Sequence, residues 1–172
     1  KAFTKEFLRR HRIPTAAYAT FTKASFDPAW VRAQRAPIVV KASGLAAGKG
    51  VVIAASADEA ISTAQAMFAG RFGGAECVIE EFLEGEEASF IVMADGEHFL
   101  PLATSQDHKR LGDADTGPNT GGMGAYSPAP VVTPAMNDRI LREVIEPTIR
   151  GLAADGMPYT GFLYAGIMIA PD

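Results

Sequence analysis

The sequence predicts an α+β fold, and three observations support this prediction. First, the predicted strands are not separated by regularly alternating helices. Second, Asp95-Gly96 stands between two strand-like runs, and this dipeptide is typical of a tight turn that joins antiparallel strands. Third, 48% of the 172 residues are hydrophobic and 21% are charged, which is the composition of a globular chain with a sizeable core.

Short local signals define the elements of the first half of the chain. Pro14 ends a first helix. Asp27-Pro28 begins a second helix with proline in its first turn, and the capping box at 56–59 begins a third. Apolar runs between these helices predict strands. In chain order we expect a helix at 3–12, a strand at 15–21, a helix at 27–35, a strand at 37–41, a glycine loop at 44–50, a strand at 51–54, a helix at 56–68 and a loop at 70–75.

The second half combines long strands, one long irregular segment and one helix. The loop at 70–75 is expected to separate a small lobe at about 16–75 from a larger one. In chain order we expect strands at 78–83, 86–94 and 97–103, a glycine- and proline-rich segment at 105–130, a helix at 133–154 that bends at Pro147, and a last strand at 161–169.

Charge and cysteine content exclude several classes of protein. The formal net charge of −4 argues against a general binder of nucleic acid or of anionic membranes, which would carry a basic excess. The single Cys77 cannot form an internal disulfide, and it fits a packed thiol in a cytoplasmic protein. One cysteine and three scattered histidines do not make a zinc site. No uninterrupted apolar run approaches the ~18 residues of a membrane span.

A glycine loop follows a strand that ends in Lys41. Glycines allow backbone N–H groups to wrap an anion, and a lysine adds a full charge. A Walker loop requires four residues between its glycines, whereas Gly44 and Gly48 have three, and Gly50 stands where a metal-binding hydroxyl belongs. The loop is therefore either a different kind of phosphate loop, with Lys41 and Lys49 as its charges, or a solvated hairpin.

Acidic residues interrupt an apolar strand at 80–90, which reads EEFLEGEEASF. Acidic residues are poor strand formers, and like charges in one neighbourhood repel each other. A linking strand could offer its backbone to an adenine edge, and a carboxylate could accept hydrogen bonds from ribose hydroxyls. The alternative is a solvated edge strand, which spacing alone favours.

The glycine-rich segment at 105–128 is the third candidate. A structureless stretch of this length inside a compact domain is usually functional or disordered. Lys109 and Arg110 could hold a phosphate, and Asp113 or Asp115 could hold an amine.

These three segments, in this order, resemble the ATP-grasp superfamily and, within it, the phosphoribosylamine–glycine ligase family. The resemblance runs from KAFTKEFL to TGFLYAGIMI, and the string GDADTGPNTGGMG is its most specific part. It implies an ATP-grasp fold in which a small lobe at 16–75 closes as a lid on a larger lobe at 76–172, with 1–15 as the entry helix of the larger lobe.

The resemblance also implies roles for individual residues. Lys1 and Lys41 would contact ATP phosphates, and the loop at 44–50 would cover them. Glu80 to Leu83 would present backbone groups to adenine, and Glu87 would accept from the ribose. The expected nucleotide residues are Lys1, Lys41, Gly44, Gly48, Lys49, Gly50, Glu80, Glu81, Phe82, Leu83 and Glu87. Lys109 and Arg110 are the expected catalytic cations, and the expected substrate residues are Asp107, Asp113, Asp115, Asn119, Thr120, Gly121 and Gly122.

The implied reaction joins glycine to 5-phosphoribosylamine at the expense of ATP with Mg²⁺ or Mn²⁺, through glycyl phosphate, in purine biosynthesis. The family's metal ligands are expected beyond Asp172, so the sequence predicts no metal ligand within this chain. Both ends look truncated, and we expect N- and C-terminal domains elsewhere in a parent chain. The isolated piece is expected to have little or no ligase activity.

Three alternative functions are compatible with the sequence. Another ATP-grasp ligase could use a different carboxylate, although the 105–124 string argues against it. A non-catalytic nucleotide-binding module, or a plain interaction domain, would need no metal ligands. For the ligase, small molecules (ATP, glycine and 5-phosphoribosylamine), rather than nucleic acid or a membrane, are the expected partners.

Overall fold

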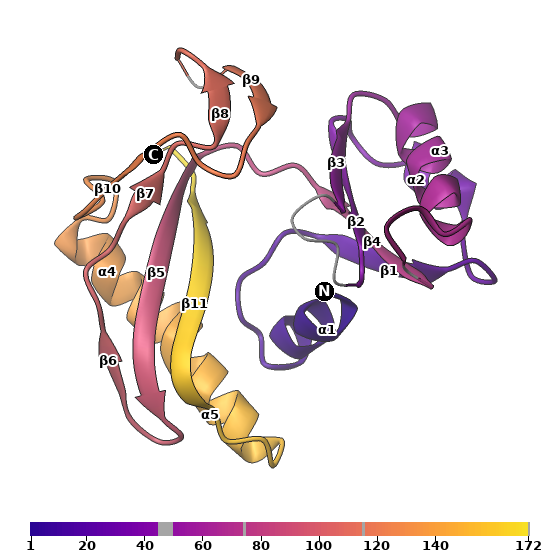
Figure 1. The fold of residues 1–172 in the computed structure, drawn as a ribbon. Coiled ribbons are helices and arrows are strands. Elements are labelled where there is room, and N and C mark those ends of the chain that lie inside the picture. Colours follow the sequence, from indigo (N-terminus) through magenta and orange to yellow (C-terminus); the bar gives the residue numbers. More distant parts are fainter. Residues whose placement is uncertain (45–49, 74, 115, 172) are drawn as a thin grey trace. The chain divides into compact units, whose positions relative to one another are not determined.

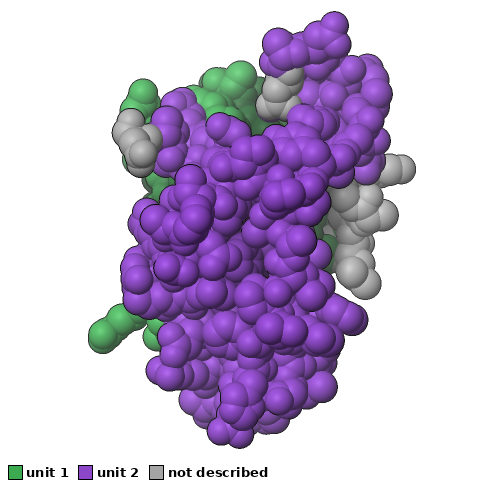
Figure 2. Space-filling view, turned by 90° about the vertical axis from the view of Figure 1, so that its left-hand side faces the viewer, with its two compact units in different colours: residues 1–83 green, residues 84–172 purple. Residues whose placement is uncertain are grey.

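A computed structural model describes residues 1–44, 50–73, 75–114 and 116–171. The chain divides into two compact units, Lys1–Leu83 and Glu84–Asp172, which Figure 2 colours separately. Each unit has its own sheet and its own hydrophobic core. None of the helices in the described ranges is both long and apolar enough to cross a membrane.

The first unit is built on a four-stranded antiparallel sheet in the order β1-β4-β2-β3 (Figure 1). Its core contains the fully buried Val31, Val40 and Met67. Its elements in chain order are α1 (Ala2–Arg10), β1 (Tyr18–Thr22), α2 (Pro28–Arg32), β2 (Ile38–Ala42), β3 (Val51–Ala54), α3 (Ala57–Phe68), the 3₁₀ turn η1 (Arg71–Gly73) and β4 (Glu76–Glu81).

Side-chain caps begin two helices of this unit where the sequence predicts them. Asp27 Oδ1 accepts a hydrogen bond from the Ala29 N–H at 2.9 Å, and Pro28 occupies the first turn of α2. Ser56 Oγ accepts from the Glu59 N–H at 3.2 Å and begins α3. Both caps satisfy N–H groups that have no partner inside the helix.

The second unit contains a three-stranded antiparallel sheet in the order β11-β5-β6. The predicted Asp95-Gly96 hairpin joins β5 to β6, so that prediction is confirmed. Phe90 and Ile149 are among the buried residues between this sheet and the helical segment. The elements in chain order are β5 (Glu86–Asp95), β6 (Phe99–Pro101), β7 (Gln106–Asp107), β8 (Arg110–Gly112), β9 (Thr116–Asn119), β10 (Ala125–Tyr126), α4 (Pro134–Ile140), η2 (Leu141–Ile145), α5 (Glu146–Ala154) and β11 (Thr160–Ile169).

The predicted helix at 133–154 contains a π-helical turn rather than a plain bend at Pro147. The turn, η2, spans Leu141–Ile145 and lies between α4 and α5. Proline lacks an N–H, and its ring collides with the carbonyl group four residues earlier. A wider π turn just before the proline relieves that collision while the helix continues.

The segment at 105–128 is more ordered than the sequence predicts. Two short antiparallel ribbons lie within it, one formed by β7 and β10 and the other by β8 and β9. Backbone hydrogen bonds join the His108 N–H to the Gly124 carbonyl at 2.8 Å and the Met123 N–H to the His108 carbonyl at 2.7 Å. These bonds satisfy backbone groups that a structureless segment would leave to water.

The boundary between the compact units differs from the predicted lobe boundary. The units meet in the sequence between Leu83 and Glu84, not at 75/76, and α1 belongs to the first unit rather than to the larger one. The physical reason is strand pairing: β4 pairs with both β1 and β2, which places it inside the first sheet.

Candidate functional site

Strand alternation places Lys41 and Glu80 on the same face of the first sheet. Val40 and Ile79 belong to the core on one face, so their neighbours Lys41 and Glu80 point to the other. Lys41 pairs with Val78 in the register, which makes Glu80 its diagonal neighbour on the adjacent strand.

Glu80 lies between two lysines and is only 5% exposed. Its Oε2 atom lies 2.5 Å from the Lys5 Nζ atom, and its Oε1 atom forms an ion pair with Lys41. The Lys41 side chain is 30% exposed and the Lys5 side chain 11%. A carboxylate that is nearly removed from water requires such partners, because desolvation disfavours its charge.

Three polar groups surround the ammonium of Lys5. Besides Glu80, it donates to Thr15 Oγ1 at 2.8 Å and to the Ala16 carbonyl at 3.1 Å. Its ammonium also lies 5.2 Å from the centre of the Tyr18 ring. Burial lowers the pKa of Lys5 to about 8, and the negative charge of Glu81 acts in the opposite direction. Lys5 is therefore charged at neutral pH and pairs with Glu80 as an ammonium.

Lys1 lies at the start of the glycine loop. Its Nζ atom donates to the Ala42 carbonyl at 2.8 Å and to the Gly44 carbonyl at 3.0 Å. At the other end of the loop, the Ala42 N–H donates to the Gly50 carbonyl at 2.8 Å. The predicted residues Gly48 and Lys49 lie outside the described residues.

β4 is a central strand, which limits what its backbone can offer. β4 pairs with β1 on one side and β2 on the other, and the Glu81 N–H donates to the Ala17 carbonyl at 3.0 Å. The Glu81 side chain accepts from the Ala17 N–H at 2.8 Å. The solvated edge strand that spacing favours is therefore not what forms. Of the residues expected to present backbone groups to adenine, only Phe82 and Leu83 follow the end of β4, so the expectation is kept for these two.

In the second unit, Lys109 pairs with two carboxylates. Its Nζ atom lies 2.6 Å from Glu87 Oε1 and 3.8 Å from Asp107 Oδ1. Partial burial works against the charge of Lys109, but the hydrogen bond to Glu87 and the charges of Glu87 and Asp107 outweigh it and raise the pKa of Lys109. Glu87, a predicted nucleotide residue, thus lies beside Lys109, a predicted catalytic cation. Asp107, a predicted substrate residue, lies on the same ammonium group.

Arg110 and the predicted substrate residues other than Asp107 belong to the β8–β9 ribbon and to the chain that follows it. An Arg110 guanidinium nitrogen donates to the Gly117 carbonyl at 2.9 Å. The Asp113 carbonyl accepts from Thr116 Oγ1 at 2.8 Å, and Thr120 Oγ1 accepts from the Gly122 N–H at 3.0 Å. The remaining predicted residues are Asn119 at the end of β9, Gly121 beside Gly122, and Asp115, which lies outside the described residues.

Sequence reasoning missed a buried amide that links β7 to its neighbours. Gln106 is 7% exposed. Its Oε1 atom accepts from the Tyr126 hydroxyl at 2.9 Å, and its Nε2 atom donates to Glu86 Oε2 at 3.3 Å. It also missed Lys5. The only sequence signal for Lys5 is its spacing of four residues from Lys1, which places both on one helix face.

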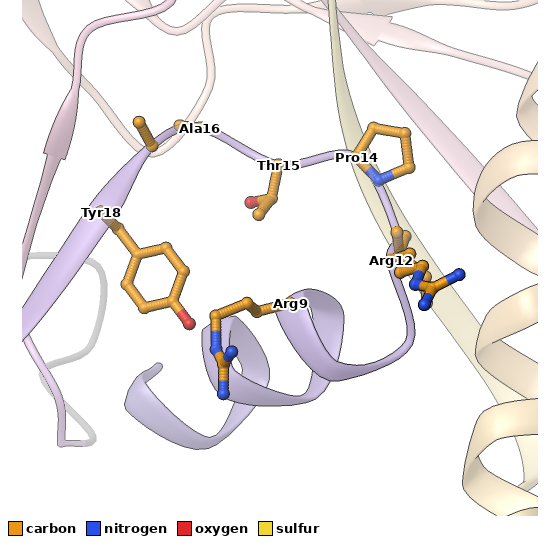
Figure 3. Close-up of a pocket in the computed structure, with 8 residues that line it drawn as sticks. Arg9, Arg12, Pro14, Thr15, Ala16 and Tyr18 are labelled. Atoms are coloured by element: carbon orange, nitrogen blue, oxygen red, sulfur yellow. The ribbon is translucent and has the colours of Figure 1, made fainter.

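A shallow pocket of about 510 Å³ lies beside α1 in the first unit. It is lined by residues 9 and 12–18, and Figure 3 shows the Arg9 and Tyr18 side chains extending toward each other at one side of it. None of the predicted site residues lines this pocket. Within the described ranges, no group of three or more histidine, cysteine, aspartate or glutamate side chains is arranged to hold a metal ion.

Three comparisons identify relatives of this chain. A phosphoribosylamine–glycine ligase of Vibrio vulnificus is 68% identical over 175 residues, which cover 100% of this chain and 41% of the relative. The solved structure of a phosphoribosylamine–glycine ligase from Thermotoga maritima has a TM-score of 0.86 at 35% identity, over 98% of this chain and 44% of its own. A solved D-alanine–D-alanine ligase from Bacillus anthracis has a TM-score of 0.69 at 21% identity, over 98% of this chain and 52% of its own, and this likeness concerns the fold alone.

The fold is that of the ATP-grasp class, which confirms the predicted α+β fold. The chain belongs to the family of phosphoribosylglycinamide synthetase ATP-grasp (A) domains, whose model matches residues 1–172. It spans about 41% of the length of the Vibrio vulnificus relative.

Proposed function

We propose that this chain is the nucleotide-binding part of an ATP-dependent ligase that joins glycine to 5-phosphoribosylamine and yields glycinamide ribonucleotide, ADP and phosphate. The observation that carries the proposal is the match of the whole chain to the ATP-grasp (A) domain of phosphoribosylglycinamide synthetase. The relatives named phosphoribosylamine–glycine ligase support the same substrates. Such a ligase acts in purine biosynthesis, where a cytoplasmic location is expected.

The first unit supplies residues suited to the nucleotide. Lys41, one residue before the end of β2, has a partly exposed ammonium, and Lys1 and Gly44 lie at the start of the glycine loop. In the proposal these groups, with Gly48, Lys49 and Gly50, hold the phosphates by charge and by backbone N–H groups. Phe82 and Leu83 offer backbone groups to the adenine.

The second unit supplies residues suited to the transfer itself. A glycine carboxylate oxygen attacks the γ-phosphorus of ATP, the bond to the β–γ bridging oxygen breaks, and ADP leaves. The amine of 5-phosphoribosylamine then attacks the carbonyl carbon of glycyl phosphate, releasing phosphate and a proton. Lys109 and Arg110 offset the negative charge that develops on the transferred group, which is the main need of phosphoryl transfer. Glu87 and Asp107 orient Lys109.

The substrate contacts in this proposal come from the β8–β9 ribbon and the glycines that follow it. Asp113 and Asp115 suit the amine groups of glycine and 5-phosphoribosylamine, and Asn119, Thr120, Gly121 and Gly122 offer amide, hydroxyl and backbone groups. The described residues do not fit a complete site for Mg²⁺ or Mn²⁺, so we derive no step through a metal ion.

Calorimetric titration of MgATP into the 172-residue chain tests the nucleotide site, with circular dichroism on the same sample to confirm folding. We expect saturable binding that Lys41→Ala weakens at least about tenfold. The matched control is Lys23→Ala, which changes an exposed lysine of the same unit that we place outside the site. A folded chain that binds no MgATP would contradict the proposed nucleotide site.

The ligase activity is tested in a polypeptide that carries this chain within the full length of its relatives. We expect phosphate release that depends on both glycine and 5-phosphoribosylamine. Turnover without glycine would indicate a ligase for another carboxylate. Tight ATP binding without any turnover would indicate a nucleotide-binding module.

A further inference from the structure

The position of Lys5 suggests more than a structural ion pair. One buried carboxylate, that of Glu80, is shared between two ammonium groups, with Oε2 facing Lys5 and Oε1 facing Lys41. The two lysines differ in their surroundings. Lys5 is 9% exposed and has three further contacts that fix it, whereas the Lys41 side chain is 30% exposed at the end of β2.

We propose that Lys5 is a positioning residue that holds the Glu80 carboxylate, so that Lys41 can turn from Glu80 to an anionic ligand. This inference rests on the proposed function, because the ligand is a nucleotide phosphate. It adds a residue that the sequence analysis does not assign to the site.

The argument follows from the cost of a buried charge. A carboxylate that is 5% exposed cannot lose its only counter-ion without a large penalty. With Lys5 in place, Glu80 keeps one ammonium partner when Lys41 turns toward a phosphate. Without Lys5, Lys41 would be the principal counter-ion of Glu80, and nucleotide binding would have to separate that pair.

The fixed geometry of Lys5 supports this role. Thr15 Oγ1 and the Ala16 carbonyl accept hydrogen bonds from its ammonium group, and Glu80 Oε2 lies 2.5 Å from its Nζ atom. The charged groups around it are Glu80 and Glu81 on β4, with Lys41 on the far side of Glu80. An ammonium held in this way supplies charge to Glu80 but is too buried to contact a ligand itself.

A double-mutant cycle on the 172-residue chain tests the inference. We expect Lys5→Met to weaken MgATP binding at least tenfold in calorimetry, and Lys5→Arg to weaken it much less. Lys5→Met combined with Glu80→Gln is expected to regain most of the loss, because a neutral amide no longer retains Lys41. A purely structural role for Lys5 predicts instead that Lys5→Met lowers the free energy of unfolding and that Glu80→Gln restores it, while the affinity of the folded chain for MgATP stays unchanged. Lys23→Met is the matched control.

A second measurement does not depend on nucleotide. The rate of Lys41 acetylation by acetic anhydride is measured by peptide mass spectrometry relative to that of Lys23 in the same chain. We expect Lys41 to react more slowly in Lys5→Met than in the wild type, and faster in Glu80→Gln. If Lys5→Met fails to fold, by circular dichroism, Lys5→Gln takes its place in the series, with the same expected slowing of Lys41 acetylation.

The outcomes separate the inference from the proposed function. A wild-type chain that binds no MgATP contradicts the proposed nucleotide site, and the acetylation series then decides the inference alone. A folded Lys5→Met chain that binds MgATP as the wild type does would overturn the inference, as would a Lys41 acetylation rate that does not respond to Glu80→Gln.

Discussion

A side chain on Gly85 would collide with the backbone of Ile169, because a Cβ atom at Gly85 would lie 2.3 Å from the Ile169 carbonyl oxygen. Gly85 immediately precedes β5, and the next residue, Glu86, pairs with Ile169 on β11. The close approach of the two chains at this end of the sheet therefore requires glycine.

We expect Gly85→Ala to destabilise the chain by about 1–3 kcal/mol, the usual cost of inserting a methyl group where no space exists. Urea unfolding followed by circular dichroism measures this change. The control is Gly121→Ala, since a Cβ atom there meets nothing within 4 Å, and its effect is expected to stay within about 0.5 kcal/mol. Equal effects of the two substitutions would contradict the packing argument.

The Lys109–Glu87 pair is expected to matter for activity rather than for stability. The two side chains are 34% and 40% exposed, and ion pairs at such positions contribute about 0–1 kcal/mol. In the full-length ligase we expect Lys109→Met to lower kcat at least tenfold, while the Tm of the chain changes by only a few degrees. An unchanged kcat would remove Lys109 from the proposed machinery.

Cys77 is expected to be unreactive in the folded protein. The residue is 0% exposed, and burial raises the pKa of its thiol from 9.0 to about 11. At pH 8 a disulfide reagent such as DTNB should therefore react with less than one thiol in ten over an hour, and with one thiol per chain after unfolding in urea. Rapid labelling of the native chain would contradict the burial of this residue.

The Cys77 thiol also makes the free energy of unfolding depend on pH, and the raised pKa of the thiol fixes the sign of this dependence. The unfolded chain releases the Cys77 proton near its ordinary pKa, whereas the folded chain retains it until pH 11 is approached. Because the folded state binds more protons in this window, the free energy of unfolding falls as the pH rises from about 9 toward 11. Cys77→Ala should remove this part of the slope in urea titrations, and an unaltered slope would contradict the assignment.

Asp95 stabilises the β5–β6 hairpin as a carboxylate. Hydrogen bonds from the backbone N–H groups of His98 and Glu97 lower the pKa of Asp95 below its ordinary 3.8. Its contribution to stability is present above the unfolded pKa and is lost as the pH falls through the folded one. We expect Asp95→Asn, which keeps an acceptor oxygen, to flatten the decline of Tm as the pH falls below about 4.

Local signals predicted the elements of this fold well, because each depends on a few neighbouring residues. Asp27 and Ser56 cap the helices that they were expected to begin, and Asp95-Gly96 forms the expected hairpin turn. The phosphate-loop prediction for Gly48 and Lys49 remains a prediction, because both residues lie outside the described ranges.

Long-range pairing explains what the sequence did not reveal. The buried position of Glu80 depends on β4 lying between β1 and β2, strands that are distant in the sequence. Lys5 reaches Glu80 only because α1 packs on that face, and Gln106 reaches Tyr126 only because β7 pairs with β10. Periodicity carries no information about such partners. Spacing alone therefore assigns the acidic stretch that includes Glu80 to solvent, whereas the fold buries Glu80 in an ion-pair cluster.

The single tryptophan provides a selective optical reporter. Trp30 packs against the core of the first unit, where its ring centre lies 5.4 Å from that of Phe21. Tryptophan emission therefore follows the melting of Lys1–Leu83, whereas far-ultraviolet circular dichroism follows both units. Where the two signals give different midpoints, a two-state fit would average two transitions, and each half of the chain would need its own unfolding curve.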